Sequence, residues 1–299
     1  MKSLMILLLL ALMGAVILGL ISVVLGLLVT GVSTGKLMDA LSEGTTNIAF
    51  LKIVQAGSSI GTFVLPALLL GVIEKRRYTY LDFKTRVNPS LWFMVVAILF
   101  FSAPVFEQAI KLNEQMKLPA ALSAIENWMK AKEAEQARLT DLLLSETSYV
   151  GLFTNLLVVA VIAAIGEEFL FRGCLQRILT RWLKNPHAAI WLTAVIFSAI
   201  HLQFYGFLPR MLLGALFGYL LFWGKNIWLP VLAHFINNAT ATVSAFYLKR
   251  QGKSLDELDF SQQIPNYLYF ISFLLTAVLL FQYYKTTSKN THSYGKTLD

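Results

Sequence analysis

Residues 166–173 read Gly-Glu-Glu-Phe-Leu-Phe-Arg-Gly, and they follow an apolar run, 150–165, that is typical of a membrane-spanning helix. Two carboxylates and an arginine at membrane depth cost several kcal/mol unless they are paired or hydrated. Such a cluster of ionisable side chains indicates a functional site, and the rest of the chain must supply its partners.

Helical spacing predicts different roles for the two glutamates. Glu168 and Arg172 are four residues apart with the acid first, so they are expected to pair on one face of a helix. Glu167 is rotated by about 100° from Glu168 and is expected to point elsewhere. Adjacent carboxylates do not ionise together easily in a medium of low dielectric constant, and Arg172 would neutralise Glu168. Glu167 is then left to carry a proton.

The composition is that of a polytopic membrane protein. Of the 299 residues, 57% are hydrophobic and 14% are charged, against about 25% charged in soluble domains. We expect one all-α domain over 1–299, a transmembrane helical bundle with about eight spans. The expected spans are 4–30, 60–73 (with a start as early as 50), 91–110, 150–173, 188–204, 208–223, 227–248 and 267–284. Residues 111–148 are predicted to form an external amphipathic connector.

The net charge of +8 follows from membrane orientation and does not require a nucleic-acid partner. Basic residues gather in the segments 74–90 and 172–186. The positive-inside rule places these segments on the cytoplasmic side, so both termini are predicted to be cytoplasmic in a multi-pass protein of the cell membrane. The single cysteine, Cys174, excludes an internal disulfide and a CxxC zinc or redox site.

Two of the four histidines, His201 and His234, lie in predicted spans, where histidine is rare. Lys184 lies 17 residues from both Glu167 and His201. A turn at 184–186 would therefore bring Glu167 and His201 to the same depth in an antiparallel hairpin. The same geometry implies that the helix carrying the glutamates is long.

His234 and Asn238 are also four residues apart, so they share a helix face. Pro230 can loosen the start of their helix. Glu167 with His201 could activate water, while His234 and Asn238 could bind an oxyanion. Alternatively, a metal ion such as zinc could be held by Glu167, His201, His234 and Asn238. An HExxH zinc-protease helix is absent. An ion or proton pathway and purely structural hydrogen bonds are the other interpretations.

Three ordered motifs resemble those of the CPBP family, the CAAX-protease and bacteriocin-processing intramembrane endopeptidases, which are also called the Abi family and include the type II CAAX prenyl proteases. The motifs are Glu167-Glu168-x-x-x-Arg172, Phe197-x-x-x-His201 and His234-x-x-x-Asn238, each expected within a helix. The resemblance covers about 150–245, the predicted catalytic core.

The resemblance implies an eight-helix fold whose cavity opens to the membrane and the cytoplasm. In it, Glu167 and His201 would activate water, His234 and Asn238 would bind the oxyanion or a metal, and Glu168 and Arg172 would support them. The implied substrates are membrane-anchored or prenylated, CaaX-like proteins or peptides. A non-catalytic immunity or scaffold protein and an ion-coupled transporter are the alternatives, and the sequence carries no signal of oligomeric state.

Overall fold

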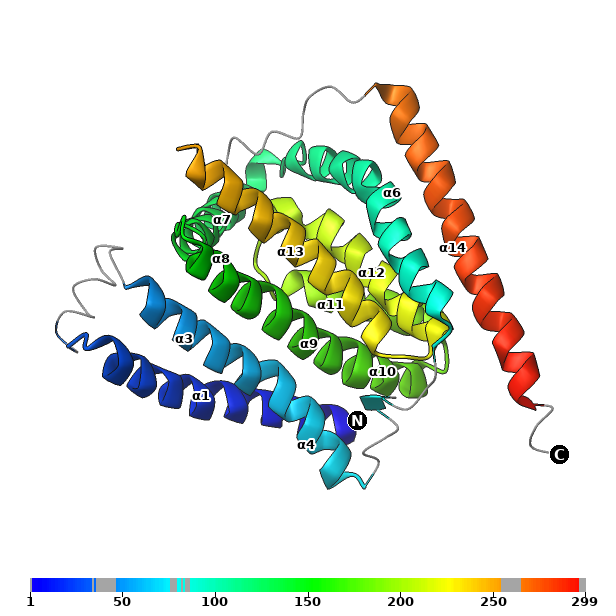
Figure 1. The fold of residues 1–299 in the computed structure, drawn as a ribbon, viewed down its shortest axis with the longest axis horizontal. Coiled ribbons are helices and arrows are strands. Elements are labelled where there is room, and N and C mark those ends of the chain that lie inside the picture. Colours follow the sequence, from blue (N-terminus) through cyan, green and yellow to red (C-terminus); the bar gives the residue numbers. More distant parts are fainter. Residues whose placement is uncertain are drawn as a thin grey trace. The chain divides into compact units, whose positions relative to one another are not determined.

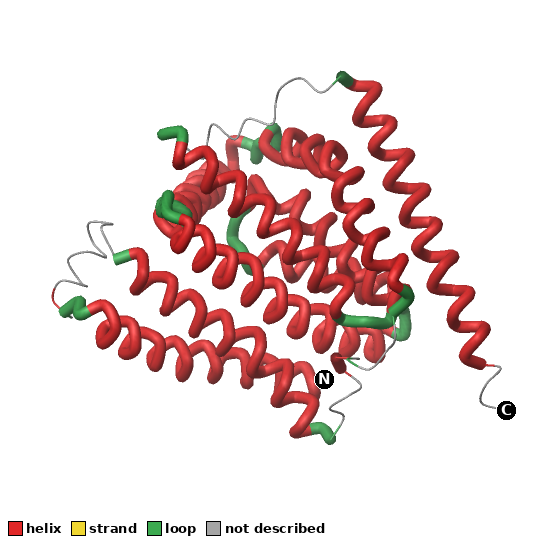
Figure 2. The backbone as a smooth tube through the Cα atoms, in the orientation of Figure 1, coloured by secondary structure: helices red, strands yellow, loops and turns green. Residues whose placement is uncertain are grey.

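The computed structural model describes residues 2–33, 35, 47–75, 80, 81, 83, 87–253 and 265–295, with side chains up to 288. Every regular element in this part of the chain is a helix, as predicted (Figure 2). Much of the predicted basic loop 74–90 falls outside the described residues. The same holds for parts of the predicted loops 31–49 and 249–265 and of the tail 285–299.

The α-helices are labelled in Figure 1, and three π-helical segments interrupt them. The α-helices are α1 (Lys2–Thr30), α3 (Ile48–Ser59), α4 (Leu65–Ile73), α6 (Pro89–Glu114), α7 (Ser123–Leu143), α8 (Tyr149–Asn155), α9 (Ala163–Glu168), α10 (Gln176–Leu183), α11 (Pro186–Ala199), α12 (Phe207–Gly224), α13 (Trp228–Arg250) and α14 (Asn266–Gly295). The π segments are η1 (Ile60–Val64), η3 (Leu156–Ile162) and η4 (Phe169–Leu175). Short 3₁₀ turns are η2 (Ala120–Leu122) and η5 (Phe204–Gly206).

Six helices among the described residues are long and apolar enough to cross a membrane, so the chain is a multi-pass membrane protein. They are Lys2–Thr30, Ile48–Ile73, Pro89–Glu114, Tyr149–Leu183, Phe204–Gly224 and Asn266–Ser288. The second expected span takes its longer form, because its helix begins at Ile48. Of the other two expected spans, α11 has 14 residues, about 21 Å of helix, and α13 has 23 residues but is more polar. The total of eight spans stays a prediction.

The described chain forms two compact units. Unit 1 comprises Met1–Leu81, Arg138–Ile178 and His234–Leu258. Unit 2 comprises Asp82–Ala137, Leu179–Ala233 and Asp259–Asp299. The boundaries fall inside α7, α10 and α13, so each of these helices contributes residues to both units.

Within unit 1, α1 packs along α3, η1 and α4 (Figure 1). The two helical segments approach closely because glycines face each other. A methyl group on Gly14 would lie 2.0 Å from the carbonyl oxygen of Gly61. The segment η1 also contacts α9, where Gly166 leaves room for the side chains of Phe63 and Val64. Small residues thus place the first helical hairpin against the helix that carries the glutamates.

Unit 2 has a hydrophobic core shared by four helices. Its buried members are Leu91, Val95 and Ile98 of α6, Leu216, Phe217 and Leu220 of α12, Leu229 and Ala233 of α13, and Tyr283 of α14. The Tyr283 hydroxyl donates to the carbonyl oxygen of Leu220 at 2.9 Å, which satisfies a buried polar group in that core.

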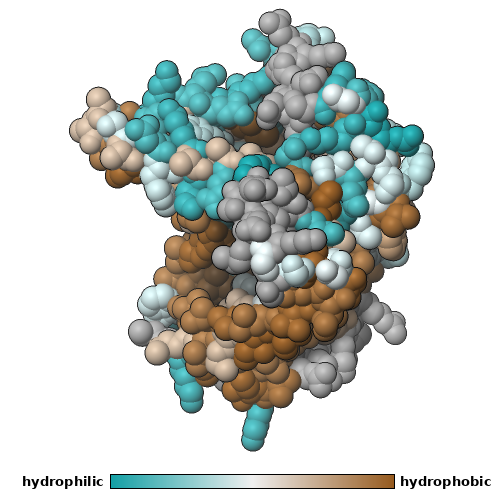
Figure 3. All heavy atoms as spheres, turned by 90° about the vertical axis from the view of Figure 1, so that its left-hand side faces the viewer, coloured by the Kyte–Doolittle hydropathy of each residue, from teal (hydrophilic) through white to brown (hydrophobic). Residues whose placement is uncertain are grey.

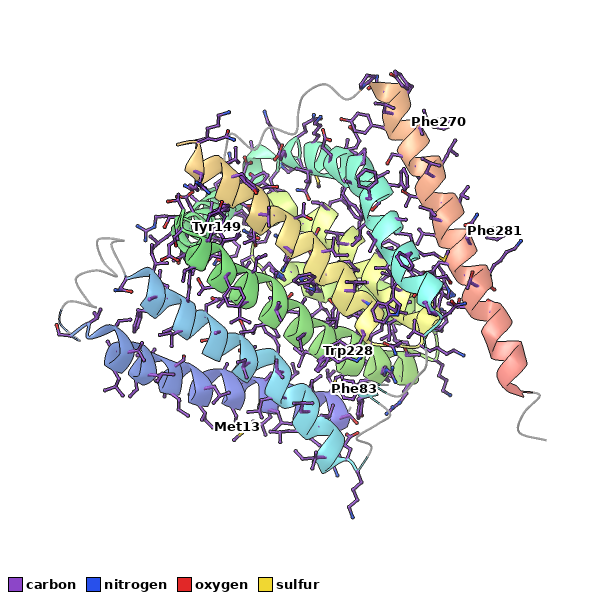
Figure 4. The ribbon with its side chains drawn as sticks, viewed as in Figure 1. Met13, Phe83, Tyr149, Trp228, Phe270 and Phe281 are labelled. Carbon is purple, nitrogen blue, oxygen red and sulfur yellow. The ribbon has the colours of Figure 1, made fainter. Side chains whose placement is uncertain are left out.

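The exposed apolar side chains are those expected to face lipid. Hydrophobic residues gather in the lower part of the face shown in Figure 3, and hydrophilic residues in its upper part. Only 11% of the most apolar stretch of α1 is buried against other parts of the protein. Met13 of α1, and Phe270 and Phe281 of α14, point away from the neighbouring helices of their own units (Figure 4). Such side chains would be unfavourable in water but are suited to a hydrocarbon solvent.

The predicted connector 111–148 forms one main helix, α7, preceded by the turn η2. Its Trp128 ring lies 5.4 Å from the ring of Phe204 in unit 2. Within unit 1, its Asp141 accepts from Lys249 at 2.5 Å. The predicted location at the outer membrane surface stays a prediction.

The close approach of Gly14 and Gly61 generates a stability prediction. In Gly14→Ala the new methyl group would meet backbone, so the helices must separate at a cost of about 1–3 kcal/mol. In Gly19→Ala the nearest atom is the Ser58 hydroxyl at 3.7 Å, and alanine is the better helix former. Thermal unfolding in detergent should show Gly14→Ala well below wild type and Gly19→Ala at or above it. Equal melting temperatures for the two variants would refute this account.

Candidate active site

The predicted site begins on a 35-residue helix, Tyr149–Leu183, which is long as expected. Its one turn of α9 carries both glutamates and is flanked by the π segments η3 and η4. At the end of η4 the Gln176 N–H donates to the carbonyl oxygen of Phe171, five residues back. Such wide turns are rare and concentrate at functional sites. The sequence carried no signal of them, because the residues of η3 are all apolar and most of those of η4 are, so a change of helical register leaves no visible break in the pattern.

The predicted pair of Glu168 and Arg172 forms. Arg172 Nη1 lies 2.9 Å from Glu168 Oε1, and both side chains are fully buried. Two opposite charges removed from solvent remain stable only with good geometry and further hydrogen bonds. The pair therefore depends on what else reaches the Glu168 carboxylate.

His234 supplies that further contact from α13. Its Nδ1 lies 2.8 Å from Glu168 Oε1, and its Nε2 lies 3.8 Å from Glu167 Oε2. A carboxylate paired with arginine accepts hydrogen bonds, so Nδ1 carries the proton and donates to Glu168. In the neutral imidazole, Nε2 then holds the lone pair and faces Glu167. Glu168 thereby sets both the orientation and the tautomer of His234.

Glu167 also lies near His234, a contact that was not predicted. Both carboxylates reach His234, one at each ring nitrogen. The 100° between them on the helix is spanned by the imidazole ring, whose two nitrogens lie on different edges. The Glu167 side chain is 13% exposed, whereas the Glu168 side chain is fully buried. Glu167 is thus the more accessible of the two acids.

Asn238 lies one turn beyond His234 on α13, as predicted. Its Nδ2 donates to the carbonyl oxygen of Val159 at 3.0 Å, and its Oδ1 accepts from Asn237 at 3.1 Å. Val159 lies in η3. The unit 1 part of α13 is therefore attached to the long helix at two places, at η3 through Asn238 and at α9 through His234. Val159 was not foreseen, because a backbone carbonyl leaves no trace in the sequence.

His201 belongs to unit 2 and lies just beyond the end of α11, not within a helix as predicted. The helix ends at Ala199, and Leu202 has a φ of 54°, in the left-handed region that cannot continue a helix. The apolar residues 199, 200, 202 and 204 concealed this end. The predicted turn at 184–186 does form: Lys184 has a φ of 52°, and the Asn185 side chain caps α11.

Two contacts between Phe197 and His201 explain their four-residue spacing. His201 Nδ1 lies 2.7 Å from the carbonyl oxygen of Phe197, and the two rings meet edge to face with centroids 5.0 Å apart. A carbonyl only accepts, so Nδ1 again carries the proton and Nε2 the lone pair. One residue thus fixes the tautomer of His201 and also packs against its ring. The predicted pairing of His201 with Glu167 stays a prediction.

Glu167 and His234 can be tested as ligands of one metal ion. Two ligands at zinc distances of about 2.0–2.1 Å lie about 3.3–3.4 Å apart. The separation of 3.8 Å between Glu167 Oε2 and His234 Nε2 is close to this value, and the second nitrogen of His234 rests on a carboxylate, as metal-bound histidines usually do. No group of three or more His, Cys, Asp or Glu side chains with metal-binding geometry occurs in the described part of the chain. Two members of the predicted ligand set fit, and His201 and Asn238 as ligands stay a prediction.

A buried lysine near this helix was missed by sequence reasoning. Lys52 of α3 forms an ion pair with Glu146 and donates to Thr154 Oγ1 at 2.8 Å. These contacts attach α8 and the segment that precedes it to α3 within unit 1. A lysine inside an apolar segment was the signal that could have revealed it.

The Glu168–Arg172 geometry predicts that loss of Arg172 lowers stability strongly and that a second substitution, at Glu168, restores much of it. Arg172→Met leaves the Glu168 charge buried without its main partner, which costs about 3–5 kcal/mol. Adding Glu168→Gln removes the stranded charge, while the amide oxygen can still accept from His234. Thermal unfolding in detergent should therefore show a low melting temperature for the single variant and substantial recovery in the double variant. A single variant as stable as wild type would contradict a stabilising pair.

Comparison with known proteins bears on the same segment. Residues 149–240, which contain all six predicted site residues, match the family model "Type II CAAX prenyl endopeptidase Rce1-like". Over 89 residues the chain is 29% identical to an uncharacterized protein, YpbD, of Bacillus subtilis (strain 168). That match covers 28% of this chain and 42% of YpbD, so the chain spans less than half of this relative. No solved structure matches the chain. Residues 149–240 of the chain are thus similar to the Rce1-like family of CAAX prenyl endopeptidases.

Proposed function

We propose that this protein is an intramembrane endopeptidase that hydrolyses a peptide bond in membrane-associated or lipidated, CaaX-like substrates. The observation that carries the proposal is the arrangement around His234. The carboxylates of Glu167 and Glu168 each lie near one of its two ring nitrogens, and the buried Arg172 neutralises the charge of Glu168. This arrangement keeps one acid, Glu167, accessible and able to exchange a proton.

In the proposed reaction, Glu167 accepts a proton from a water molecule that His201 helps to orient through Nε2. The water oxygen attacks the carbonyl carbon of the scissile peptide bond, and the carbonyl oxygen becomes an oxyanion. Glu167 then passes the proton to the departing amine as the C–N bond breaks. The products are a carboxylic acid and an amine, and Glu167 returns to its starting state.

His234 and Asn238 are the proposed partners of the oxyanion. Asn238 would use the side-chain N–H that does not donate to the Val159 carbonyl. His234 can donate from Nε2 only in its doubly protonated form, because its Nδ1 proton is directed at Glu168. The carboxylates on both sides provide acceptors for that form. Glu168 and Arg172 act through His234 and are positioning residues in this scheme.

A metal-dependent form of the site uses the same residues. Glu167, His201 and His234, with Asn238 as an accessory ligand, would hold a divalent ion such as zinc, whose chemistry is to lower the proton affinity of bound water and polarise the substrate carbonyl. The neutral tautomers inferred for both histidines place a lone pair on Nε2, which suits a ligand as well as a base.

We further propose that the protein lies in the cell membrane with both termini in the cytoplasm. Its partners would be the lipid bilayer and membrane-anchored or prenylated peptides and proteins. The six apolar helices and the family match support a membrane location. The basic segments 74–90 and 172–186 support the orientation.

The proposal is tested by digestion of a peptide library with and without farnesylated CaaX ends, followed by mass spectrometry. Glu167→Gln should lower cleavage by at least about 10²-fold, because the base is lost. Glu135→Gln, on exposed α7, is the matched control and should cleave as wild type does. Equal products from wild type and Glu167→Gln, both folded, would instead favour an immunity, scaffold or transport role.

Metal dependence is decided by a separate measurement. If the site uses a metal, purified protein should contain about one zinc per chain, and a chelator should abolish cleavage until zinc is restored. His234→Ala should then lower both the zinc content and the rate. Full activity in the chelator, with no zinc bound, would assign the reaction to Glu167 without a metal.

A further inference from the structure

The segment that follows His201 is held by a buried asparagine of α6. Asn113 is 2% exposed. Its Nδ2 donates to the carbonyl oxygen of Phe204 at 2.9 Å, and its Oδ1 accepts from the N–H of Leu208 at 2.5 Å. All of these residues belong to unit 2. A single side chain therefore connects the 3₁₀ turn η5 to the first turn of α12.

The hydrogen bond to Leu208 satisfies a backbone N–H that the helix leaves unpaired, and the Phe204 carbonyl oxygen, which also accepts from the Phe207 N–H in η5, gains a second donor. The first N–H groups of a helix have no intrahelical acceptor, and Leu208 lies in the first turn of α12. The N–H of Leu208 is satisfied by Asn113, and the Ser198 hydroxyl donates to the carbonyl oxygen of Phe207 at 2.7 Å. Two buried side chains thus hold residues 200–208: Ser198, which precedes the segment in α11, and Asn113 of α6.

Helix α7 contacts the same segment. The Trp128 ring lies 5.4 Å from the Phe204 ring, and Glu133 accepts from the N–H of Tyr205 at 3.3 Å. Trp128 is 48% exposed, so much of its surface lies outside the hydrophobic core. The predicted external connector therefore has a specific contact, three to four residues after His201.

We propose that Asn113 is the positioning residue for His201, with Trp128 and Glu133 of α7 as secondary supports of the segment 200–208. The role rests on the proposed function of His201 in hydrolysis. His201 is held on its N-terminal side by the carbonyl oxygen and ring of Phe197. On its C-terminal side it lies outside the helix, so the course of the backbone depends on Asn113.

Loss of Asn113 would leave the Leu208 N–H without this acceptor and would remove one of the two donors to the Phe204 carbonyl oxygen. The segment would relax to satisfy them, and His201 Nε2 would move from the position required for catalysis. A misplacement of about 1 Å can lower a rate by about 10²-fold. Substrate binding elsewhere would be less affected, so the defect should appear in kcat more than in KM.

The experiment measures kcat and KM on a peptide cleaved in the library digestion, together with hydrogen exchange over 200–208 by mass spectrometry. Asn113→Ala is compared with Asn88→Ala, a matched control at the other end of α6, where Asn88 caps the helix by accepting from the N–H of Ser90. We expect Asn113→Ala to lower kcat by about 10-fold or more with KM within about twofold. Exchange over 200–208 should become faster in this variant and stay unchanged in Asn88→Ala.

A second pair of variants serves if Asn113→Ala does not fold. Trp128→Ala, on an exposed side chain, should lower kcat moderately, and Trp128→Phe, which keeps a ring against Phe204, should restore it. Wild-type kcat in Asn113→Ala, or in Trp128→Ala where the first variant is unfolded, would overturn the positioning role. An equal loss in Asn88→Ala would also overturn it, because general destabilisation would then be sufficient. Glu167→Gln in the same assay separates the two proposals: if it cleaves as wild type does, the proposed function fails and the role of Asn113 falls with it.

Discussion

The buried carboxylate of Glu168 is the constraint on which the candidate site depends. A charge with no exposure to water must be matched by neighbours, and here one oxygen accepts from both Arg172 and His234. Arg172 lies on the same helix, so this part of the compensation is local. His234 comes from α13 and therefore brings a second helix against the first. The electrostatic requirement of a single residue thus determines which face of α13 approaches α9 within unit 1.

The two site histidines share one design with different acceptors. In each, Nδ1 donates to a fixed oxygen, which is the Glu168 carboxylate for His234 and the Phe197 carbonyl for His201. Each acceptor fixes the ring and leaves Nε2 as the nitrogen available for chemistry. The carbonyl belongs to the turn directly before His201 and needs no charge compensation. The carboxylate needs an arginine to neutralise its charge. The acceptor for His234 therefore lies in a motif that also contains Arg172, whereas the acceptor for His201 needs only the short Phe-x-x-x-His motif.

Local relations in the site could be predicted from the sequence, and relations between distant segments could not. The four-residue spacing of Glu168 and Arg172 is helix geometry, and it predicted their pairing. The long helix, the turn at Lys184–Pro186 and the helical fold followed from apolar length and turn residues. The contacts of Glu167 and Glu168 with His234 depend on how helices pack, so they were not predicted. The end of α11 was missed because apolar residues continue to Phe204 with no glycine or proline to mark it. Asn113 bonds to residues more than 90 positions away, and no pattern announces such a contact.

The residues with proposed chemical roles and several of the residues that hold them in place come from different parts of the sequence. The residues with proposed chemical roles all lie within 149–240, the segment that matches the Rce1-like family. Several of the side chains that hold this segment lie outside it: Lys52 attaches α8 to α3 in unit 1, and Asn113, Trp128 and Glu133 hold the segment after His201 in unit 2. The supports act through single hydrogen bonds or ring contacts to backbone and loop residues, whereas the chemical groups depend on one another through shared charge. In the proposed scheme, a change in α7 alters the placement of His201 without altering the Glu168–Arg172 charge pair. Helix α7 would then adjust the position of one chemical group and leave the charged groups of the site unchanged.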